Sequence, residues 1–259
     1  LIDVLADASE EILEPLGIQF EQSASEAGAA ALLSASIHYP LRGAVTWKSV
    51  VGTNVASDAI ANLASTGVTG GALMIIGEDY GEGSSIMQER THSFAMKSSL
   101  PLIDPRYDMT KLVELTEQAF EMSEASHLPV FMTLRIRACH MTGSFIAKDN
   151  KVPEFNLNNP VPEAAYDVTK IVLPPASYNH EQDKFAERLP AVQRFIREHG
   201  INEIFAGDGG RYGIITQGGA HGMVARSLRQ LGAADGYGNS DVPMLVLNVI
   251  HPLVPEEIA

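Results

Sequence analysis

The stretch that decides the fold class is Ala72-Leu-Met-Ile-Ile76, a continuous apolar run bounded by Gly71 and Gly77. A strand with one face in water alternates apolar and polar residues, whereas a strand covered on both faces in a parallel sheet is apolar throughout. The run has the length of such a strand and is too short for a typical helix. We therefore expect residues 72–76 to form a central strand of a sheet that helices cover on both faces.

Helices and strands are predicted to alternate on both sides of this run. Apolar residues at helical spacing predict helices over residues 1–16, 26–37, 55–65, 109–126, 182–199 and 220–231, and another that ends near Met96. Short apolar runs predict strands at residues 18–20, 43–47, 130–136, 212–216 and 244–249, and near Leu102. Such alternation is typical of an α/β fold with a mainly parallel sheet and helices on both faces.

A proline-rich segment divides the chain. Residues 148–180 show little periodicity and predict an irregular excursion or linker, because they contain Pro153, Pro160, Pro162, Pro174 and Pro175. We expect a first domain over residues 1–147 and a second, smaller α/β unit over residues 181–259. The chain begins without methionine, directly in a helical pattern, and ends in a proline-punctuated stretch, so we expect it to be part of a longer protein.

Composition excludes several classes of function. The chain has 32 acidic and 18 basic residues and a formal net charge of −14, which disfavours binding to nucleic acid and to anionic membranes. Its one cysteine, Cys139, excludes an internal disulfide and a zinc or iron–sulfur site held by cysteines of this segment alone. No apolar run approaches the ~20 residues of a membrane-spanning helix. We expect a cytoplasmic protein.

The segment Ser23-Ala-Ser-Glu26 has the spacing of a capping box. In that motif the Ser23 hydroxyl accepts from the backbone N–H of Glu26, and the Glu26 carboxylate accepts from the N–H of Ser23. Helix starts of this kind are common and need no further function. On spacing alone, Glu26 is a helix cap.

Three segments in order resemble a known family. They are Ser25-Glu-Ala-Gly-Ala-Ala30, Gly43-Ala-Val-Thr-Trp-Lys48 and Gly52-Thr-Asn54. Together they are similar to the pyrimidine-binding domain of the thiamine-diphosphate-dependent 2-oxoacid:ferredoxin oxidoreductases. The resemblance covers most of residues 1–145 and about 205–255.

The resemblance implies a catalytic and cofactor-binding role for Glu26. In the family, the glutamate of Ser-Glu-Ala-Gly hydrogen-bonds a ring nitrogen of the aminopyrimidine of thiamine diphosphate, and Glu26 stands at that position. A carboxylic acid there favours the imino tautomer, whose exocyclic nitrogen can deprotonate the thiazolium carbon. The cofactor carries out the carbanion chemistry and the protein tunes it.

A second resemblance implies a substrate-binding role for Arg90. The segment from Glu82 to Met96 is similar to the family segment that follows the third strand, including its arginine and its Phe-Ala-Met. In pyruvate-type members this arginine pairs with the substrate carboxylate, a role suited to a planar guanidinium group. The alternative is a surface salt bridge of Arg90 with Glu89 or Asp79.

Other polar residues are weaker candidates. Thr53 and Asn54 are typical helix caps, although the family resemblance makes Asn54 a candidate for contact with the pyrimidine or the substrate. His92 has the chemistry of an acid or base, but a lone histidine on a helix is more often structural. We predict no metal site, because His38, His127, His140 and His221 show no paired spacing suggestive of metal ligands.

The segment Gly207-Asp-Gly209, with Asn239 downstream, is similar to the magnesium motif of thiamine enzymes. That motif requires a helix directly after it, whereas here a strand is predicted at residues 212–216. We therefore expect Asp208 to belong to a turn. The segment Arg211 to Gly219 instead resembles the start of a transketolase C-terminal-like domain, which the chain does not complete.

Further details are similar to the indolepyruvate-type branch, among them Val45-Thr-Trp-Lys48 and Arg135-Ile-Arg-Ala-Cys-His140. The resemblance implies an enzyme that oxidatively decarboxylates indolepyruvate or another aryl 2-oxoacid, transfers electrons to ferredoxin and releases an acyl-coenzyme A. It also implies a diphosphate-binding domain on the same or a neighbouring chain, magnesium and [4Fe-4S] clusters held outside this segment, and a homo- or hetero-oligomer. The isolated segment should have little activity. Two alternatives remain, a noncatalytic partner or regulatory module of the same fold and a nonoxidative thiamine-dependent decarboxylase.

Overall fold

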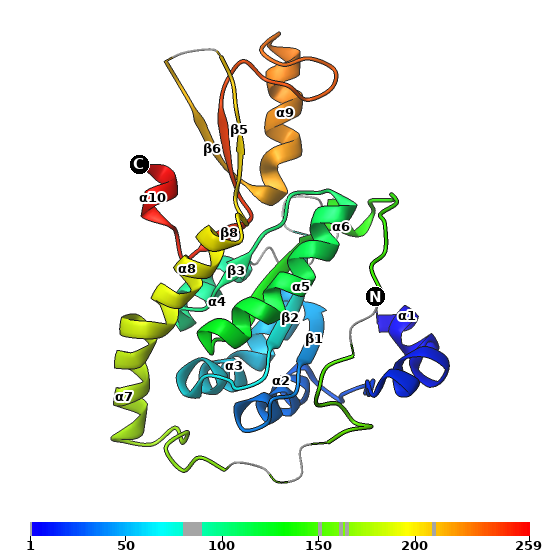
Figure 1. Ribbon diagram of the computed structural model, residues 1–259, viewed down its shortest axis with the longest axis vertical. Coiled ribbons are helices and arrows are strands. Elements are labelled where there is room, and N and C mark those ends of the chain that lie inside the picture. Colours follow the sequence, from blue (N-terminus) through cyan, green and yellow to red (C-terminus); the bar gives the residue numbers. More distant parts are fainter. Residues whose placement is uncertain (1, 80–89, 150–151, 161–162, 164–165, 209–210) are drawn as a thin grey trace.

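Two sheets organise the molecule. The structure is a computed structural model and describes residues 2–79, 90–149, 152–160, 163, 166–208 and 211–259. Within these residues, one sheet has five strands in the order β1-β2-β4-β3-β8, and the other has three in the order β5-β7-β6. In Figure 1 the smaller sheet and helix α9 form a lobe beyond one end of the larger sheet and its helices.

The elements have the following bounds. The larger sheet consists of β1 (Gly43–Lys48), β2 (Ala72–Glu78), β3 (Leu102–Ile103), β4 (Val130–Arg135) and β8 (Val249–His251), and the smaller one of β5 (Glu203–Phe205), β6 (Ile214–Gln217) and β7 (Met244–Leu247). The α-helices are α1 (Ile2–Asp7), α2 (Glu26–Leu33), α3 (Asn54–Thr66), α4 (Thr91–Ser98), α5 (Met109–Ser126), α6 (Ile136–Cys139), α7 (Ala176–Asp183), α8 (Leu189–Glu198), α9 (His221–Gln230) and α10 (Pro255–Ile258). Short 3₁₀- or π-helical turns adjoin them: η1 (Ser9–Leu13), η2 (Glu14–Leu16), η3 (Ser34–Ile37), η4 (Ser49–Thr53), η5 (Lys184–Arg188) and η6 (Gly218–Ala220).

The larger sheet is parallel except at one edge. Strands β1, β2, β4 and β3 pair in parallel, and β8 joins β3 antiparallel. The apolar run of β2 is buried as predicted, since Leu73, Met74 and Ile76 are 0% exposed. The predicted α/β fold with a mainly parallel sheet is confirmed.

Helices cover both faces of this sheet. Helix α5 packs on β2 and β4 and is itself covered by α8, while α2 packs on β1 and on α3. The chain moves one way across the sheet from β1 to β2 and the opposite way from β3 to β4. Because such crossovers are right-handed, α3 and α5 lie on opposite faces. Figure 1 shows α5 running across the face turned toward the viewer.

The two sheets are joined at Asn248. The prediction of one strand over residues 244–249 is wrong, because the chain leaves the smaller sheet after β7 and enters the larger one as β8. Asn248 is 0% exposed; it accepts from the Arg106 N–H at 2.8 Å and donates to Ile201 O at 2.8 Å and to Glu203 Oε2 at 2.9 Å. The Arg106 guanidinium also binds both carboxylate oxygens of Glu203, at 2.9 and 3.0 Å. Polar contacts therefore fix the junction.

Other local predictions also fail. Residues 18–20 form no strand; Ile18 is 46% exposed and follows Gly17, whose positive φ of 74° ends η2. The helix predicted over residues 1–16 is divided into α1, η1 and η2, and strand β5 was not predicted. Each of these segments is short, and contacts elsewhere in the fold decide its conformation.

Helix α8 shares the core of the larger sheet. Its side chains Val192, Phe195 and Ile196 lie in the same buried cluster as the strands. Between residues 148 and 175, the described residues contain no helix, and an isolated bridge joins Asn156 to Asn159. The division into residues 1–147, 148–180 and 181–259 stays a prediction.

Candidate functional site

The elements that carry the three predicted site residues meet at one edge of the larger sheet. Parallel strands end at the same edge, and β1 leads through η4 to Asn54, the first residue of α3. Arg90 precedes α4, which follows β2. Helix α2 runs back toward β1, so its first residue, Glu26, lies at the same edge. Both α2 and α4 contact η4. This is the edge at which α/β proteins bind their ligands.

Glu26 is half-buried at the first position of α2. The predicted capping box is wrong, because the cap is Ser25, whose hydroxyl accepts from the Gly28 N–H at 3.2 Å. No hydrogen bond or ion pair joins the Glu26 carboxylate to any of the described residues. The capping interpretation of Glu26 therefore loses its basis, and its carboxylate remains available to a ligand.

Close packing explains why the last residue of the Ser-Glu-Ala-Gly segment, Gly28, has no side chain. A Cβ at Gly28 would lie 2.6 Å from Ser23 Oγ, closer than real Cβ contacts allow. Gly28 thus lets the segment before α2 fold closely over the first turn of the helix. A larger side chain at this position would need Ser23 to move.

The loop before Asn54 is held by Trp47 rather than by a helix cap. The Trp47 indole N–H donates to the Thr53 hydroxyl at 3.0 Å, and Thr53 is 0% exposed. The side chain of Thr53 does not cap α3, contrary to its predicted role. A Cβ at Gly52 would lie 2.4 Å from the Trp47 ring. Asn54 is exposed beyond this packed turn, and its contact with the pyrimidine or substrate stays a prediction.

Arg90 is the exposed N-cap residue of α4 and has an extended backbone, with φ of −133° and ψ of 135°. Of its two alternative partners, Asp79 binds Lys48 Nζ at 2.9 Å, and Glu89 lies outside the described residues. The other residues before Arg90 in the segment that resembles the family, from Glu82 onward, also lie outside the described residues. Both interpretations of Arg90 stay predictions.

Sequence reasoning missed three charged residues that end the strands at this edge. Glu78 ends β2 and is 2% exposed, Arg135 ends β4, and Asp104 follows β3 and is 0% exposed. The Arg135 guanidinium donates to Asp104 Oδ2 and to Gln217 Oε1, the latter at 2.8 Å. Burial raises the pKa of Asp104 above its ordinary value even though Arg135 opposes the shift. A charged residue at the end of a buried apolar run is a sequence signal that identifies such positions.

The sequence of the chain is similar to those of several known proteins. No family model matches the chain. It is 29% identical over 245 residues to a protein of Methanothermobacter marburgensis named indolepyruvate oxidoreductase subunit IorA, and 28% over 243 residues to the subunit of that name in Methanothermobacter thermautotrophicus. The identity to the same subunit of Thermococcus kodakarensis is 25% over 231 residues. The chain is a relative of these IorA subunits. The names of these relatives agree with the indolepyruvate-type family that the motifs resemble.

These relatives are longer than the chain. The three matches cover 93%, 93% and 89% of the chain but 37%, 37% and 35% of the relatives. The chain therefore spans about a third of the length of the IorA subunits. It aligns with them through both sheets, so the likeness is not confined to the segment around Glu26.

The histidines of the described residues form no group that resembles a metal site. Both ring nitrogens of His92 are buried and hydrogen-bond to none of the described residues. His221 stacks on Phe205 with ring centroids 5.2 Å apart, and burial lowers its pKa. Within the described part of the chain, no three His, Cys, Asp or Glu side chains are grouped to hold a metal ion.

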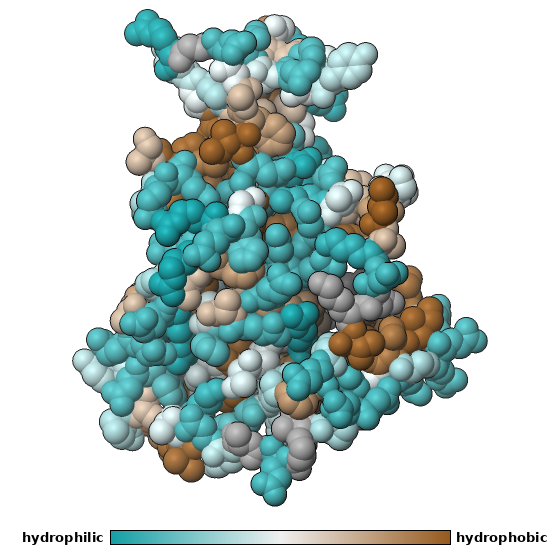
Figure 2. Space-filling model, in the orientation of Figure 1, coloured by the Kyte–Doolittle hydropathy of each residue, from teal (hydrophilic) through white to brown (hydrophobic). Residues whose placement is uncertain are grey.

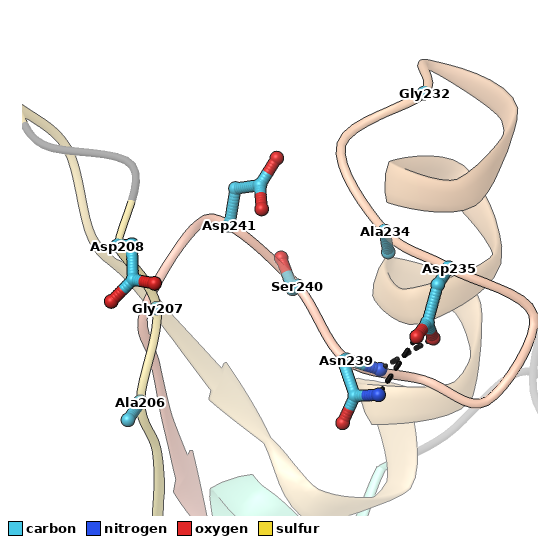
Figure 3. A pocket seen from close by; sticks show the side chains of 9 residues that line it. All are labelled: Ala206, Gly207, Asp208, Gly232, Ala234, Asp235, Asn239, Ser240 and Asp241. Atoms are coloured by element: carbon cyan, nitrogen blue, oxygen red, sulfur yellow. Dashed lines mark hydrogen bonds between the residues drawn. The ribbon is translucent and has the colours of Figure 1, made fainter.

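A pocket in the smaller lobe contains Asp208 and Asn239 (Figure 3). Asp208 lies between β5 and β6, and the first element after it among the described residues is strand β6, close to the strand predicted at residues 212–216. Asn239 does not point to Asp208, since its Nδ2 donates to Asp235 Oδ2 at 2.7 Å. Asp235 also accepts from the N–H groups of Tyr237 and Asn239, and the Asn239 bond leads the effects that lower its pKa. These contacts hold together the loop from Asp235 to Asn239.

The face of the molecule shown in Figure 2 is mainly hydrophilic with separate apolar patches. Among the helices of the described residues, none combines the length and the apolar character needed to cross a membrane.

Proposed function

We propose that this chain is part of a thiamine-diphosphate-dependent indolepyruvate:ferredoxin oxidoreductase and that Glu26 binds the aminopyrimidine ring of the cofactor. The name of the related subunits supports an indolepyruvate oxidoreductase. The observation that carries the role of Glu26 is its carboxylate, half-buried at the sheet edge and bound to none of the described residues.

The donor set fits a thiamine ring. A ring nitrogen needs one carboxyl group that can share a proton with it, and Glu26 supplies this group from the rigid first turn of α2. The Ser25 cap and the close packing of Gly28 leave the carboxylate outside the helix's own hydrogen bonds. The cofactor supplies the carbon nucleophile and the electron sink for decarboxylation. Glu26 holds a proton at the ring nitrogen.

Two further residues of the edge complete the proposed site. Asn54 presents its amide from the first turn of α3 and is proposed to contact the ring or the substrate. The guanidinium of Arg90 is proposed to bind the carboxylate of the 2-oxoacid through two parallel N–H donors, which orients the keto carbon toward the cofactor. Lysine would offer a single point charge there.

Other components are proposed to lie outside this chain. They are a diphosphate-binding domain with its magnesium, [4Fe-4S] clusters, coenzyme A as acyl acceptor and ferredoxin as electron acceptor. Because the related subunits are longer and are named as subunits, we propose that these parts belong to the rest of the enzyme, an oligomer in the cytoplasm. Catalysis then takes place where another domain closes over the sheet edge.

The complete enzyme tests this proposal. It is incubated with indolepyruvate, coenzyme A and oxidised ferredoxin, with and without thiamine diphosphate, and both acyl-coenzyme A and reduced ferredoxin are measured. We expect both products, in equal two-electron equivalents, only when the cofactor is present. An aldehyde product that needs no acceptor would indicate a nonoxidative decarboxylase. Absence of thiamine-dependent turnover would favour a regulatory module and contradict the proposal.

A further inference from the structure

The first turn of α4 is capped from another element. The N–H of Thr91, the first residue of the helix, donates to Glu78 Oε1 at the end of β2. The side chain of the N-cap residue itself, Arg90, makes no capping hydrogen bond. The first N–H groups of a helix lack partners within it, and a carboxylate near them is also favoured by the helix dipole. Glu78 therefore connects the start of α4 to strand β2 of the larger sheet.

This cap is costly to maintain. Glu78 is 2% exposed, and its second oxygen, Oε2, is buried without a hydrogen bond to any described residue. Burying a carboxylate with an unsatisfied oxygen is unfavourable, whereas a serine or asparagine at the N-cap would serve the helix from the surface. Stabilisation of α4 alone does not explain why a buried carboxylate caps it. A better explanation is that Glu78 fixes the position of the residue directly before the helix.

That position belongs to Arg90. Arg90 directly precedes Thr91, and Glu78 lies on a strand paired on both sides, with β1 and with β4. A hydrogen bond at the adjacent residue thus connects the backbone of Arg90 to a central strand of the larger sheet. From this geometry we infer that Glu78 is a positioning residue for Arg90 and so sets where its guanidinium meets the substrate carboxylate. This inference rests on the proposed function.

Four variants of the full-length enzyme test it. Glu78→Ala removes the acceptor, and Glu78→Gln keeps an amide oxygen that can accept from Thr91. Thr91→Pro removes the donor instead; proline is favoured at the first position of a helix, and the extended backbone of Arg90 suits a following proline. Asp108→Ala is the matched control, since Asp108 caps α5 through the Lys111 N–H at 2.9 Å and α5 carries no predicted site residue.

Three measurements are made on each variant: KM and kcat with indolepyruvate, the melting temperature, and hydrogen exchange of the first turn of α4. For Glu78→Ala and Thr91→Pro we expect KM to rise by about tenfold, as a loss of about 1.4 kcal/mol of binding produces, with a smaller change in kcat and faster exchange. Glu78→Gln should keep the KM and the exchange rate of the wild type. Asp108→Ala should lower the melting temperature and leave KM unchanged.

A wild-type KM in folded Glu78→Ala and Thr91→Pro enzymes would overturn the inference, as would a KM in Asp108→Ala that rises with theirs. If Glu78→Ala does not fold, Thr91→Pro decides. Loss of the proposed function is distinguishable, because a wild-type enzyme without thiamine-dependent turnover refutes that function alone. In that case the exchange data still show whether Glu78 holds α4, and unchanged exchange would overturn that part too.

Discussion

The two sheets contain strands of similar apolar character but differ in how they are covered. In the larger sheet, Phe131 on β4 is 0% exposed because helices pack on both faces. In the smaller sheet, Ile204 and Ile215 both stand opposite Leu245 in register, and so on one face, yet they are 76% and 53% exposed. An apolar strand is therefore not evidence of a closed core. The larger sheet, whose central strands are covered on both faces, carries the candidate site at its edge, where a packed scaffold can position side chains.

Truncation of an apolar strand residue should have the most different effects on stability in the two sheets. Phe131→Ala should lower the free energy of unfolding by about 3–5 kcal/mol, because it leaves a cavity in a packed interior. Ile204→Ala should change it by no more than about 0.5 kcal/mol, as expected for an exposed side chain. Urea denaturation of the purified proteins measures both. A large cost for Ile204→Ala would mean that this face is covered in solution and would break the comparison.

A substitution at the junction between the sheets should have the next largest effect on stability. Asn248→Ala leaves buried groups of Ile201, Glu203 and Arg106 without their partner, so we expect a cost of about 1–3 kcal/mol. Asn239→Ala is the control, because its bond to Asp235 is at the exposed surface of the smaller lobe. Denaturation curves of the two variants are compared. Equal, small costs would show that Asn248 does not lock the sheets together.

Substrate binding should depend on Arg90 at the edge of the larger sheet and not on Asp208 in the smaller lobe. Arg90→Lys should raise KM for the 2-oxoacid by about tenfold, or about 1.4 kcal/mol, because lysine cannot bind both carboxylate oxygens in the plane of a guanidinium. The affinity for thiamine diphosphate should not change. Asp208→Asn, in the pocket of the smaller lobe, should leave both constants unchanged. Steady-state kinetics and cofactor titration test this, and an unchanged KM in Arg90→Lys would remove Arg90 from the site.

The smallest effect concerns pH. Burial alone would raise the pKa of Glu203, but hydrogen bonds from Arg106 and Asn248 outweigh it and hold the pKa below its ordinary value. The resulting stability is present above an ordinary carboxyl pKa of about 4.3 and is lost as pH falls through the folded-state value. We expect at most about 1 kcal/mol, since the pair is partly exposed. Unfolding of wild type and Glu203→Gln between pH 7 and pH 3 should converge at low pH; a constant difference would contradict this.

Sequence was most informative where burial is complete. The run at residues 72–76 predicted a strand covered on both faces, and the long helix at residues 109–126 was predicted with its observed bounds, because periodicity over many residues is a strong signal. Short elements were not predictable in this way. Whether residues 244–249 form one strand or two depends on where Asn248 finds its partners, which are distant in sequence.

The candidate site was predictable only in part. The motifs identified Glu26, Asn54 and Arg90, and the topology brings their elements to one edge. Glu78 and Asp104 were missed because their roles depend on burial and on partners in other elements. The start of the helix at Glu26 was predicted, but its cap was placed two residues too early, since Ser25 rather than Ser23 accepts from the backbone of the first turn.

The carboxyl group of Glu26 is the contact on which the proposed cofactor site depends, and a single substitution tests it. Glu26→Gln in the complete enzyme keeps the size of the side chain and the Ser25 cap but removes the shared proton, and Glu21→Gln on the exposed segment before α2 is its control. We expect thiamine-dependent turnover to fall by about 100-fold or more in Glu26→Gln, with an unchanged melting temperature, and to stay at the wild-type level in Glu21→Gln. Wild-type turnover in Glu26→Gln would contradict the proposed role of Glu26 at the thiamine ring.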